Sequence, residues 1–184
     1  MDKLTVLYDV GGINGLCIIE CRCFEDRREN LYETYNRQEL IKKGLVAKFV
    51  QDNEAYSRKG VLRGFGVNTN VPQAKLIRVL SGKIFDVVID LRPNSKTFMN
   101  SFSINLSASN KKQLYIPEGF GHAYLALEDS KVLFKVTAHF VPGDEIGFSW
   151  NSKAFNVNWP LSANEIIFSD KDRENPEFDI AMVM

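Results

Sequence analysis

The stretch "AKLIRVLSGKIFDVVIDLR", residues 74–92, contains two apolar runs separated by Ser81-Gly82-Lys83. Both runs are rich in Val, Ile, Leu and Phe, which are residues that suit the pleated, half-buried surface of a strand. A short connection containing glycine between two such runs is typical of a β-hairpin. The stretch therefore predicts two antiparallel strands joined by a tight turn.

Similar segments recur along the chain at close spacing, separated by Gly, Pro, Asn and Ser. Many short strands with frequent turn residues favour a sandwich or barrel over alternating βαβ units. The other strand candidates are "LCIIECRCF" (16–24), "AKFVQDN" (47–53), "GVLRGF" (60–65), "FSINLS" (102–107), "QLYIPEGF" (113–120), "HAYLALE" (122–128) and "KVLFKVTAHF" (131–140).

One helix is clearly indicated. Asn36 and Glu39 form an Asn-x-x-Glu start, Leu40 and Ile41 supply the apolar side, and Gly44 suits the exit. A second short helix is expected after "SDKD" (169–172). The sequence predicts one mainly β domain spanning residues 1–184, with a few short helices.

Composition excludes several classes of function. The 23 Lys and Arg residues balance the 23 Asp and Glu residues, with no long run of either sign. No nucleic-acid surface or electrostatic membrane anchor is therefore expected. The N-terminal sequence lacks the pattern of a secretory signal, and no apolar run approaches the ~18 residues of a membrane span. We expect a cytoplasmic protein.

The cysteine and histidine content argues against a metal centre. Cys17, Cys21 and Cys23 share one face of an extended segment, but no convincing fourth ligand accompanies them. Buried thiols in a reducing compartment are the simpler interpretation. His122 and His139 are the two histidines of the chain, whereas metal-dependent β-barrel enzymes usually gather two or three imidazoles and a carboxylate. We expect no metal and no cofactor.

Five longer motifs follow one another in a characteristic order. Together they cover roughly residues 15 to 178, and the series resembles the dTDP-4-dehydrorhamnose 3,5-epimerase family, sugar-nucleotide epimerases of the cupin superfamily. The motifs are "FEDRRENLYETYN" (24–36), "FVQDNEAYSRKGVLRG" (49–64), "QAKLIRVLSGKIFDVVIDLRPNSKTF" (73–98), "QLYIPEGFGHAYLAL" (113–127) and "NVNWP…IIFSDKD" (156–172).

The resemblance implies a cupin-type β jelly roll and a homodimer in which the N-terminal segment reaches into the partner's site. It implies a metal-free epimerase acting on a nucleoside-diphosphate-linked 4-keto-6-deoxy sugar. In that reaction a base removes a proton next to the ketone, a cation stabilises the enolate, and an acid returns the proton on the opposite face. Such enzymes make deoxysugars for surface polysaccharides such as lipopolysaccharide, or for glycosylated metabolites.

On the nucleotide side of the site, the resemblance places two sets of residues. Arg28 and Glu33 belong to "DRRENLYE" (26–33), and Gln51, Asp52 and Asn53 form the "QDN" run. These residues do not by themselves distinguish thymine from cytosine or guanine, so the nucleobase stays open.

Four further positions match residues around the sugar diphosphate. Arg63 in "LRG" fits a guanidinium that grips phosphate oxygens in two places. Lys75 in "AKL" matches a lysine that stabilises the enolate. His122 in "PEGFGH" matches a second histidine lining the sugar pocket, and Glu145 falls near an acidic position of the family.

The catalytic base of the family is absent from its usual position. That base is a histidine that follows "LRG" and one leucine, and here the same stretch reads Phe65-Gly66. Glycine has no side chain that could accept a proton. Lys171 and Asp172 match a Lys-Asp pair whose aspartate orients that histidine, so Asp172 has no imidazole there to orient.

The proton donor is absent as well. The family has Tyr-Lys in the strand after the second histidine, and here "VLFKVT" places Phe134 before Lys135. A positioned base or acid contributes ~10²- to 10⁴-fold each. Losing both would remove ~6–10 kcal/mol of transition-state stabilisation if nothing substitutes.

Three interpretations stay open. The first is a variant epimerase, acting at C3 alone or at both carbons, with His122 as substitute base, Lys75 as electrophile, and Tyr35, Tyr124 or a water returning the proton. The second is a 3,4-ketoisomerase of the same substrates. The third is a non-catalytic protein that binds the sugar nucleotide or a partner.

Overall fold

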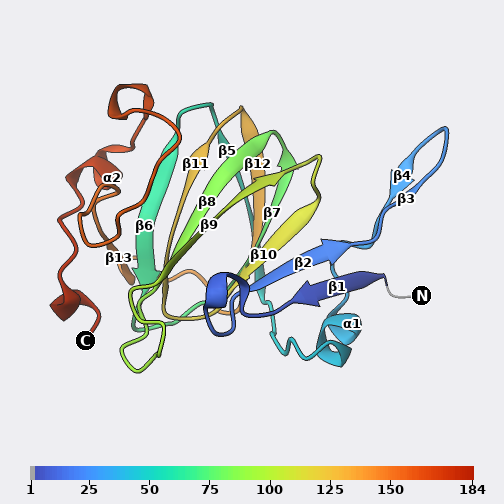
Figure 1. Ribbon diagram of the computed structural model, residues 1–184, viewed down its shortest axis with the longest axis horizontal. Helices are drawn as coiled ribbons and strands as arrows, with labels where there is room; N and C mark the ends of the chain where they lie inside the picture. The colour runs from blue at the N-terminus through green and yellow to red at the C-terminus, as the bar shows by residue number, and fades with distance from the viewer. Residues whose placement is uncertain (1–2) are drawn as a thin grey trace.

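The computed structural model describes residues 3–184, which form two antiparallel sheets facing each other (Figure 1). Six strands pair in the order β1-β2-β10-β7-β12-β5, and five pair in the order β13-β6-β11-β8-β9. The strands are β1 Leu4–Leu7, β2 Cys17–Cys21, β3 Phe24–Glu25, β4 Asn30–Leu31, β5 Gln51–Ser57, β6 Leu62–Asn68, β7 Lys75–Ser81, β8 Lys83–Asp90, β9 Ser101–Ser107, β10 Lys112–Ile116, β11 Phe120–Ala126, β12 Ser130–Val136 and β13 Glu145–Gly147. The predicted mainly β jelly roll is confirmed.

Helical structure is brief. The helices are α1 Arg37–Lys42 and α2 Asp170–Glu174, with 3-10 turns η1 Val10–Gly12, η2 Ala163–Glu165 and η3 Ile180–Met182. The helix predicted from Asn36 is confirmed, and the second predicted helix is present but begins at Asp170, inside "SDKD", and not after it. The Asn36 side chain caps α1 by accepting from the backbone N–H groups of Gln38 and Glu39, and the Ser169 side chain caps α2 by accepting from Asp172 N–H. No helix within residues 3–184 is long and apolar enough to cross a membrane.

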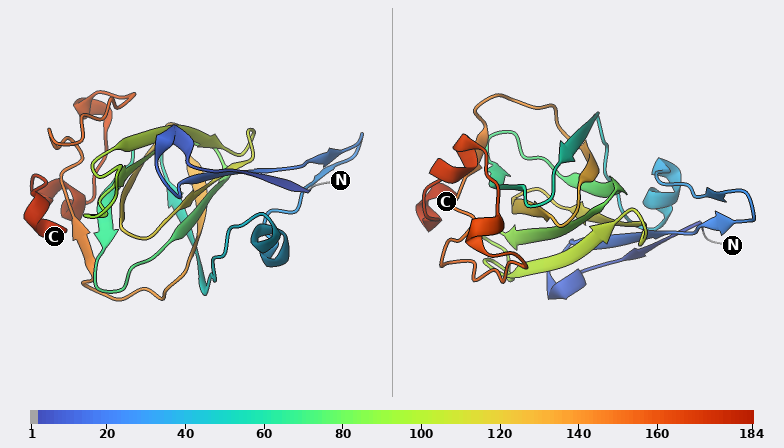
Figure 2. Two further views of the ribbon diagram at one scale, coloured as in Figure 1. Left: turned by 60° about the horizontal axis from the view of Figure 1, so that its bottom comes forward. Right: turned by 90° about the horizontal axis from the view of Figure 1, so that it is seen from above.

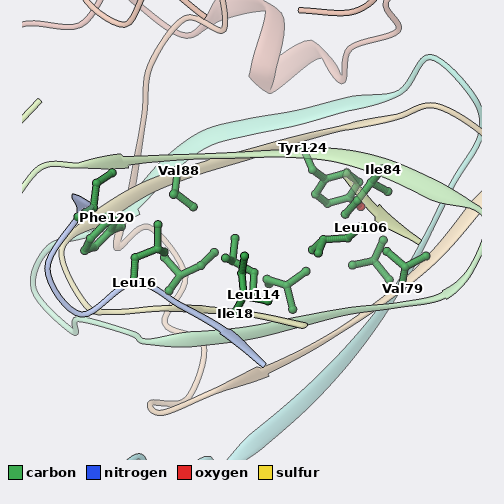
Figure 3. Close-up of a cluster of buried hydrophobic side chains, with 13 residues drawn as sticks. Leu16, Ile18, Val79, Ile84, Val88, Leu106, Leu114, Phe120 and Tyr124 are labelled. Atoms are coloured by element: carbon green, nitrogen blue, oxygen red, sulfur yellow. The ribbon is translucent and has the colours of Figure 1, made fainter. Parts of the chain in front are cut away.

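The main core lies between the two sheets. Because side chains alternate along a strand, one face of each sheet is apolar and packs against the other sheet. Figure 3 shows side chains from both sheets pointing toward one another. The labelled members of this buried cluster are Leu16, Ile18, Val79, Ile84, Val88, Leu106, Leu114, Phe120 and Tyr124.

Both outer faces are also covered, at opposite ends of the molecule (Figure 1). Leu40 of α1 packs with Cys17 and Leu76 on the outside of the six-stranded sheet. Phe65 packs with Phe148 on the outside of the five-stranded sheet, and residues of the C-terminal segment pack against that cluster. Because both outer faces are covered, the space between the two sheets is left for a ligand site.

Cys17 is buried, as predicted, whereas Cys21 and Cys23 are half-buried. Cys17 and Cys21 belong to the same outer cluster, and both thiols, like that of Cys23, are free. Burial is the main reason that the pKa of Cys17 is raised to about 12. The Cys23 sulfur accepts a hydrogen bond from Lys111 Nζ at 3.0 Å.

The hairpin predicted for residues 74–92 is wrong. Strand β7 lies in the six-stranded sheet, and β8 lies in the five-stranded sheet. Gly82, with φ of +78°, forms a corner at which the chain crosses from one sheet to the other. From β5 onward consecutive strands alternate between the sheets, apart from the neighbours β8 and β9. The residues Ser81-Gly82-Lys83 suit either a hairpin or a corner between two sheets. Because β7 pairs with β10 and β12, it lies in the six-stranded sheet, and the connection to β8 is a corner.

Replacing Gly82 by alanine is expected to destabilise this corner. Its positive φ disfavours any side chain, and a Cβ there would overlap the carbonyl oxygen of Asp129 and lie 2.5 Å from Ser130 Oγ. We expect a loss of roughly 1–3 kcal/mol or more in the free energy of unfolding, measured by urea denaturation. Gly143→Ala is the control, because its φ is +82° but a Cβ would meet no described atom within 4 Å. Equal losses in the two variants would contradict the steric argument.

Candidate active site

A cavity of about 240 Å³ lies between the two sheets. Its wall combines residues of β6, β7, β11, β12, β13 and α2. The lining residues are Arg63, Gly64, Lys75, Ile77, His122, Tyr124, Val132, Phe134, Glu145, Ser169, Lys171 and Asp172. The structure therefore brings together all three predicted catalytic residues, His122, Lys75 and Asp172.

The six-stranded sheet contributes one cation and an apolar surface. Lys75 pairs with Val136, and Ile77 pairs with Phe134, so Lys75 and Phe134 lie on the same face of neighbouring strands. Burial lowers the pKa of the Lys75 ammonium, and the nearby carboxylates of Glu145 and Asp86 only partly offset this effect. Phe134 packs against the central core and presents no transferable proton.

The five-stranded sheet contributes an imidazole held by a buried carboxylate. His122 Nε2 lies 3.0 Å from Asp86 Oδ2, and the Asp86 side chain has no exposed surface. A carboxylate can only accept a hydrogen bond, so in this contact His122 Nε2 donates and Asp86 Oδ2 accepts. The sequence motifs do not indicate Asp86. The feature that could have indicated it is an acidic residue at a core-facing position of β8, between Ile84 and Val88.

Gly66 leaves room for a side chain from the adjacent strand. Gly147 of β13 pairs with Gly66 of β6, and Gly66 pairs in turn with His122 of β11. A Cβ on Gly66 would lie 2.5 Å from Glu145 Oε1 and 2.7 Å from Glu145 Cδ. The Glu145 carboxylate thus occupies the space that a side chain at position 66 would fill.

Cations around Glu145 keep its carboxylate ionised. Lys171 Nζ donates a 2.8 Å hydrogen bond to Glu145 Oε2. Burial by itself would raise the pKa of Glu145, but this hydrogen bond and the charges of Lys75 and Lys171 outweigh burial, so the pKa is lowered. The same hydrogen bond raises the pKa of Lys171.

Asp172 lies in the cavity wall at the start of α2. Its Oδ2 accepts a 2.8 Å hydrogen bond from Ser169 Oγ, and its backbone N–H donates to the same hydroxyl. These contacts cap α2. Position 66, where the resemblance expects the imidazole that this aspartate orients, is glycine, and the imidazole that lines the same cavity as Asp172 is that of His122.

Arg63 borders the cavity and a neighbouring hollow of about 340 Å³ that Gln51 and Asn53 also line. Gln51 Nε2 donates a 2.8 Å hydrogen bond to Asn53 Oδ1. Asp52 lies between them on β5 and projects from the opposite face, where Lys135 Nζ pairs with its Oδ2 at 2.7 Å. Two of the three "QDN" residues therefore lie beside the cavity, and Asp52 does not.

Arg28 and Glu33 lie away from this cavity. Arg28 follows β3 in the ribbon that projects from the body (Figure 2), and its side chain is 78% exposed and paired with Asp26. Glu33 Oε1 accepts from Asn36 Nδ2 near the start of α1.

The two tyrosines proposed as proton donors lie in different places. Tyr124 lines the cavity and its hydroxyl lies 2.9 Å from that of Ser57, whereas Tyr35 packs in the outer cluster.

Comparison with known proteins agrees with this architecture. Residues 11–179 match the family described as dTDP-4-dehydrorhamnose 3,5-epimerase. The enzyme of that name from Methanothermobacter thermautotrophicus is 40% identical over 174 residues, covering 90% of this chain and 94% of the relative.

Solved structures of such enzymes superpose closely. The dTDP-4-dehydrorhamnose 3,5-epimerase of Bacillus anthracis, with TDP and PPi bound, has a TM-score of 0.89 at 36% identity, covering 95% of this chain and 99% of the other. The dTDP-6-deoxy-D-glucose-3,5-epimerase of Legionella pneumophila, in complex with dTDP-4-keto-L-rhamnose, has a TM-score of 0.89 at 31% identity, covering 98% and 95%. The matched residues, the jelly-roll topology and the cavity between the sheets show together that this chain belongs to the dTDP-4-dehydrorhamnose 3,5-epimerase family.

Proposed function

We propose that this protein is an epimerase of a nucleoside-diphosphate-linked 4-keto-6-deoxy sugar, inverting C3, C5 or both. The observation that carries the proposal is the convergence of Lys75 with the His122–Asp86 pair in one cavity between the sheets. A ketone beside Lys75 acidifies the carbons on either side of it, because the ammonium stabilises the enolate oxygen. An imidazole fixed by a buried carboxylate is a suitable proton acceptor.

The substrate class is supported by Arg63 and by the family. Arg63 borders the cavity, and a guanidinium can bind a diphosphate through two hydrogen bonds. Gln51 and Asn53 line the adjacent hollow and offer amide groups to the nucleoside. Relatives have been solved with TDP and PPi and with dTDP-4-keto-L-rhamnose. We assign a nucleotide-linked sugar to this chain as well. Glu145, Lys171 and Asp172 would surround the sugar.

The proposal includes a homodimer acting in the cytoplasm. The projecting β3–β4 ribbon carries Arg28 away from its own cavity (Figure 2), and exposed Phe24 and Leu31 lie on this ribbon. Exposed apolar side chains on a projecting ribbon suit contact with another chain. In such a dimer, Arg28 and Glu33 would bind the nucleotide in the partner's site. Free thiols fit a reducing compartment. The product would supply deoxysugar for a surface polysaccharide such as lipopolysaccharide.

Deuterium exchange tests the proposal directly. The protein is incubated in D₂O with a dTDP- or CDP-linked 4-keto-6-deoxy hexose, and deuterium at C3 and at C5 is followed by NMR. Epimerisation places deuterium at every inverted carbon. A product whose ketone has moved to C3 would instead identify a ketoisomerase.

Lys75→Met is expected to slow this exchange by about 10²- to 10³-fold, because the enolate loses its neighbouring cation. Methionine is similar in length and apolar, so the buried position tolerates it. Lys131→Met is the control, since Lys131 lies on β12 outside the cavity and makes an exposed ion pair with Glu54. Exchange at the wild-type rate in Lys75→Met would contradict the assigned role.

A second candidate function is binding without turnover. Gly66 and Phe134 favour it, because neither residue can transfer a proton where the family has its base and acid. Tight binding of TDP by calorimetry, with no exchange for any nucleotide-linked 4-keto sugar, would support this function over epimerisation.

A further inference from the structure

The carboxylate of Glu145 fills the space that a Cβ on Gly66 would occupy, and Glu145 lines the cavity. Glu145 lies on β13 and His122 on β11, with Gly66 of β6 between them. The two side chains therefore approach the same part of the cavity from either side of the glycine.

The neighbouring acids have other partners. Asp144 Oδ1 accepts from the backbone N–H of Asn70 at 2.9 Å, and its Oδ2 accepts from that of Val71 at 3.2 Å, so Asp144 holds the turn after β6. The Asp172 carboxylate accepts from Ser169 Oγ, the N-cap of α2, and the buried Asp86 carboxylate pairs with His122. Of these four carboxylates, those of Glu145 and Asp172 belong to residues that line the cavity. Glu145 differs from Asp172 in that its hydrogen-bond donor is a cation, Lys171.

We propose that Glu145 is a proton acceptor of the reaction and takes a proton from a carbon next to the ketone, in the space that Gly66 leaves open. This inference rests on the proposed function and adds a catalytic group to it. Lys171 holds one carboxylate oxygen at 2.8 Å, which leaves Oε1 above Gly66 to face the substrate.

The proton-transfer step balances as follows. The C–H bond breaks, its proton forms an O–H bond on Glu145, and its electron pair forms the carbon–carbon double bond of an enolate whose oxygen lies beside Lys75. Water on the opposite face then gives a proton to the same carbon and becomes hydroxide. The Glu145 proton passes to solvent and combines there with this hydroxide to form water, which returns Glu145 to its carboxylate form. Inversion results because removal and return use opposite faces. Phe134 on the opposite wall has no proton to give, so water supplies it.

The lowered pKa of Glu145 means that the carboxylate is ready to accept a proton at neutral pH but is a modest base. Lys75 compensates by acidifying the carbon. The groups that face Glu145 are Lys75 from β7, His122 from β11 and Lys171 from α2.

Two variants test the proposal by different means. Glu145→Gln removes the proton acceptor and keeps its size. Gly66→Ala keeps every titratable group but places a Cβ 2.5 Å from Oε1, so the flexible carboxylate must leave. Glu128→Gln is the control, because that carboxyl is exposed and lies outside the cavity. Deuterium incorporation at C3 and at C5 is measured for each with a dTDP-linked 4-keto-6-deoxy hexose, and TDP binding by calorimetry checks the fold.

We expect both variants to bind TDP and to lose about 10²- to 10⁴-fold of the exchange rate at one carbon or both, with Glu128→Gln unchanged. Exchange within about tenfold of the wild type at both carbons in Glu145→Gln would overturn the inference and leave the epimerase intact. A wild-type protein that exchanges neither carbon for any nucleotide overturns the proposed function itself, so the two failures are distinguishable.

Discussion

His122→Asn is expected to lower kcat/KM for epimerisation by about 10²- to 10⁴-fold, because it removes the imidazole that accepts or relays the proton. Asparagine still offers an N–H group to Asp86, so the buried carboxylate that lies 3.0 Å from His122 Nε2 can keep a partner. The loss should therefore appear in catalysis, measured as deuterium exchange at C3 and C5, with little change in the unfolding midpoint.

The second histidine supplies a matched control. His139 is exposed and lies outside the cavity, so His139→Asn should retain full activity. Full activity in His122→Asn as well would remove His122 from the mechanism. A large loss in His122→Asn together with full activity in Glu145→Gln would make the imidazole the sole acceptor on this wall.

Asp90→Ala is expected to lower the free energy of unfolding by about 1–3 kcal/mol, because it leaves the half-buried donors Arg92, Ser95 and Thr97 without their acceptor. The Asp90 side chain has no exposed surface and pairs with Arg92 at 2.8 Å. It also accepts hydrogen bonds from Ser95 Oγ at 2.6 Å and from Thr97 Oγ1 at 2.7 Å. These contacts hold the loop between β8 and β9, and urea denaturation should show a lower midpoint with the same slope.

The pH dependence of stability gives an independent check on Asp90. Burial by itself would raise the pKa of this carboxyl, but hydrogen bonds from Arg92, Ser95 and Thr97 hold it at about 2. Because this pKa lies below the ordinary value, the contribution of Asp90 to stability is present above the ordinary pKa and is lost as pH falls through about 2.

Asp26→Ala is the control for Asp90→Ala. The ion pair of Asp26 with Arg28 is exposed, so its loss should not change stability measurably. Equal losses in the two variants would contradict the buried role.

Much of the fold was predictable from local patterns. Every predicted strand overlaps an observed one, and α1 begins at Arg37, directly after the Asn36 cap that the sequence indicated. Some boundaries differ: the strand predicted to start at Ala47 begins at Gln51, and the segment 16–24 divides into β2 and β3. Local propensity identifies elements well because period-two hydrophobicity and capping residues act over a few positions.

The pairing of strands was not predictable in the same way. Ser81-Gly82-Lys83 indicates a turn, but β7 and β8 lie in different sheets. The partners of each strand are set by packing between segments that are distant in sequence. Turn residues do not encode that choice.

For the site, the sequence determined which side chains are present: the arginine, lysine and histidine of the motifs, and the lack of a proton-transfer group at Gly66 and Phe134. Only the tertiary structure decided which of them meet. In the folded protein Asp86 pairs with His122, and Asp52 pairs with Lys135 on the face of β5 away from the cavity. The Glu145 carboxylate fills the space beside Gly66. Spacing along a chain fixes the face of a strand that a residue occupies, but contact across neighbouring strands depends on register, and register follows from the packing of the whole core.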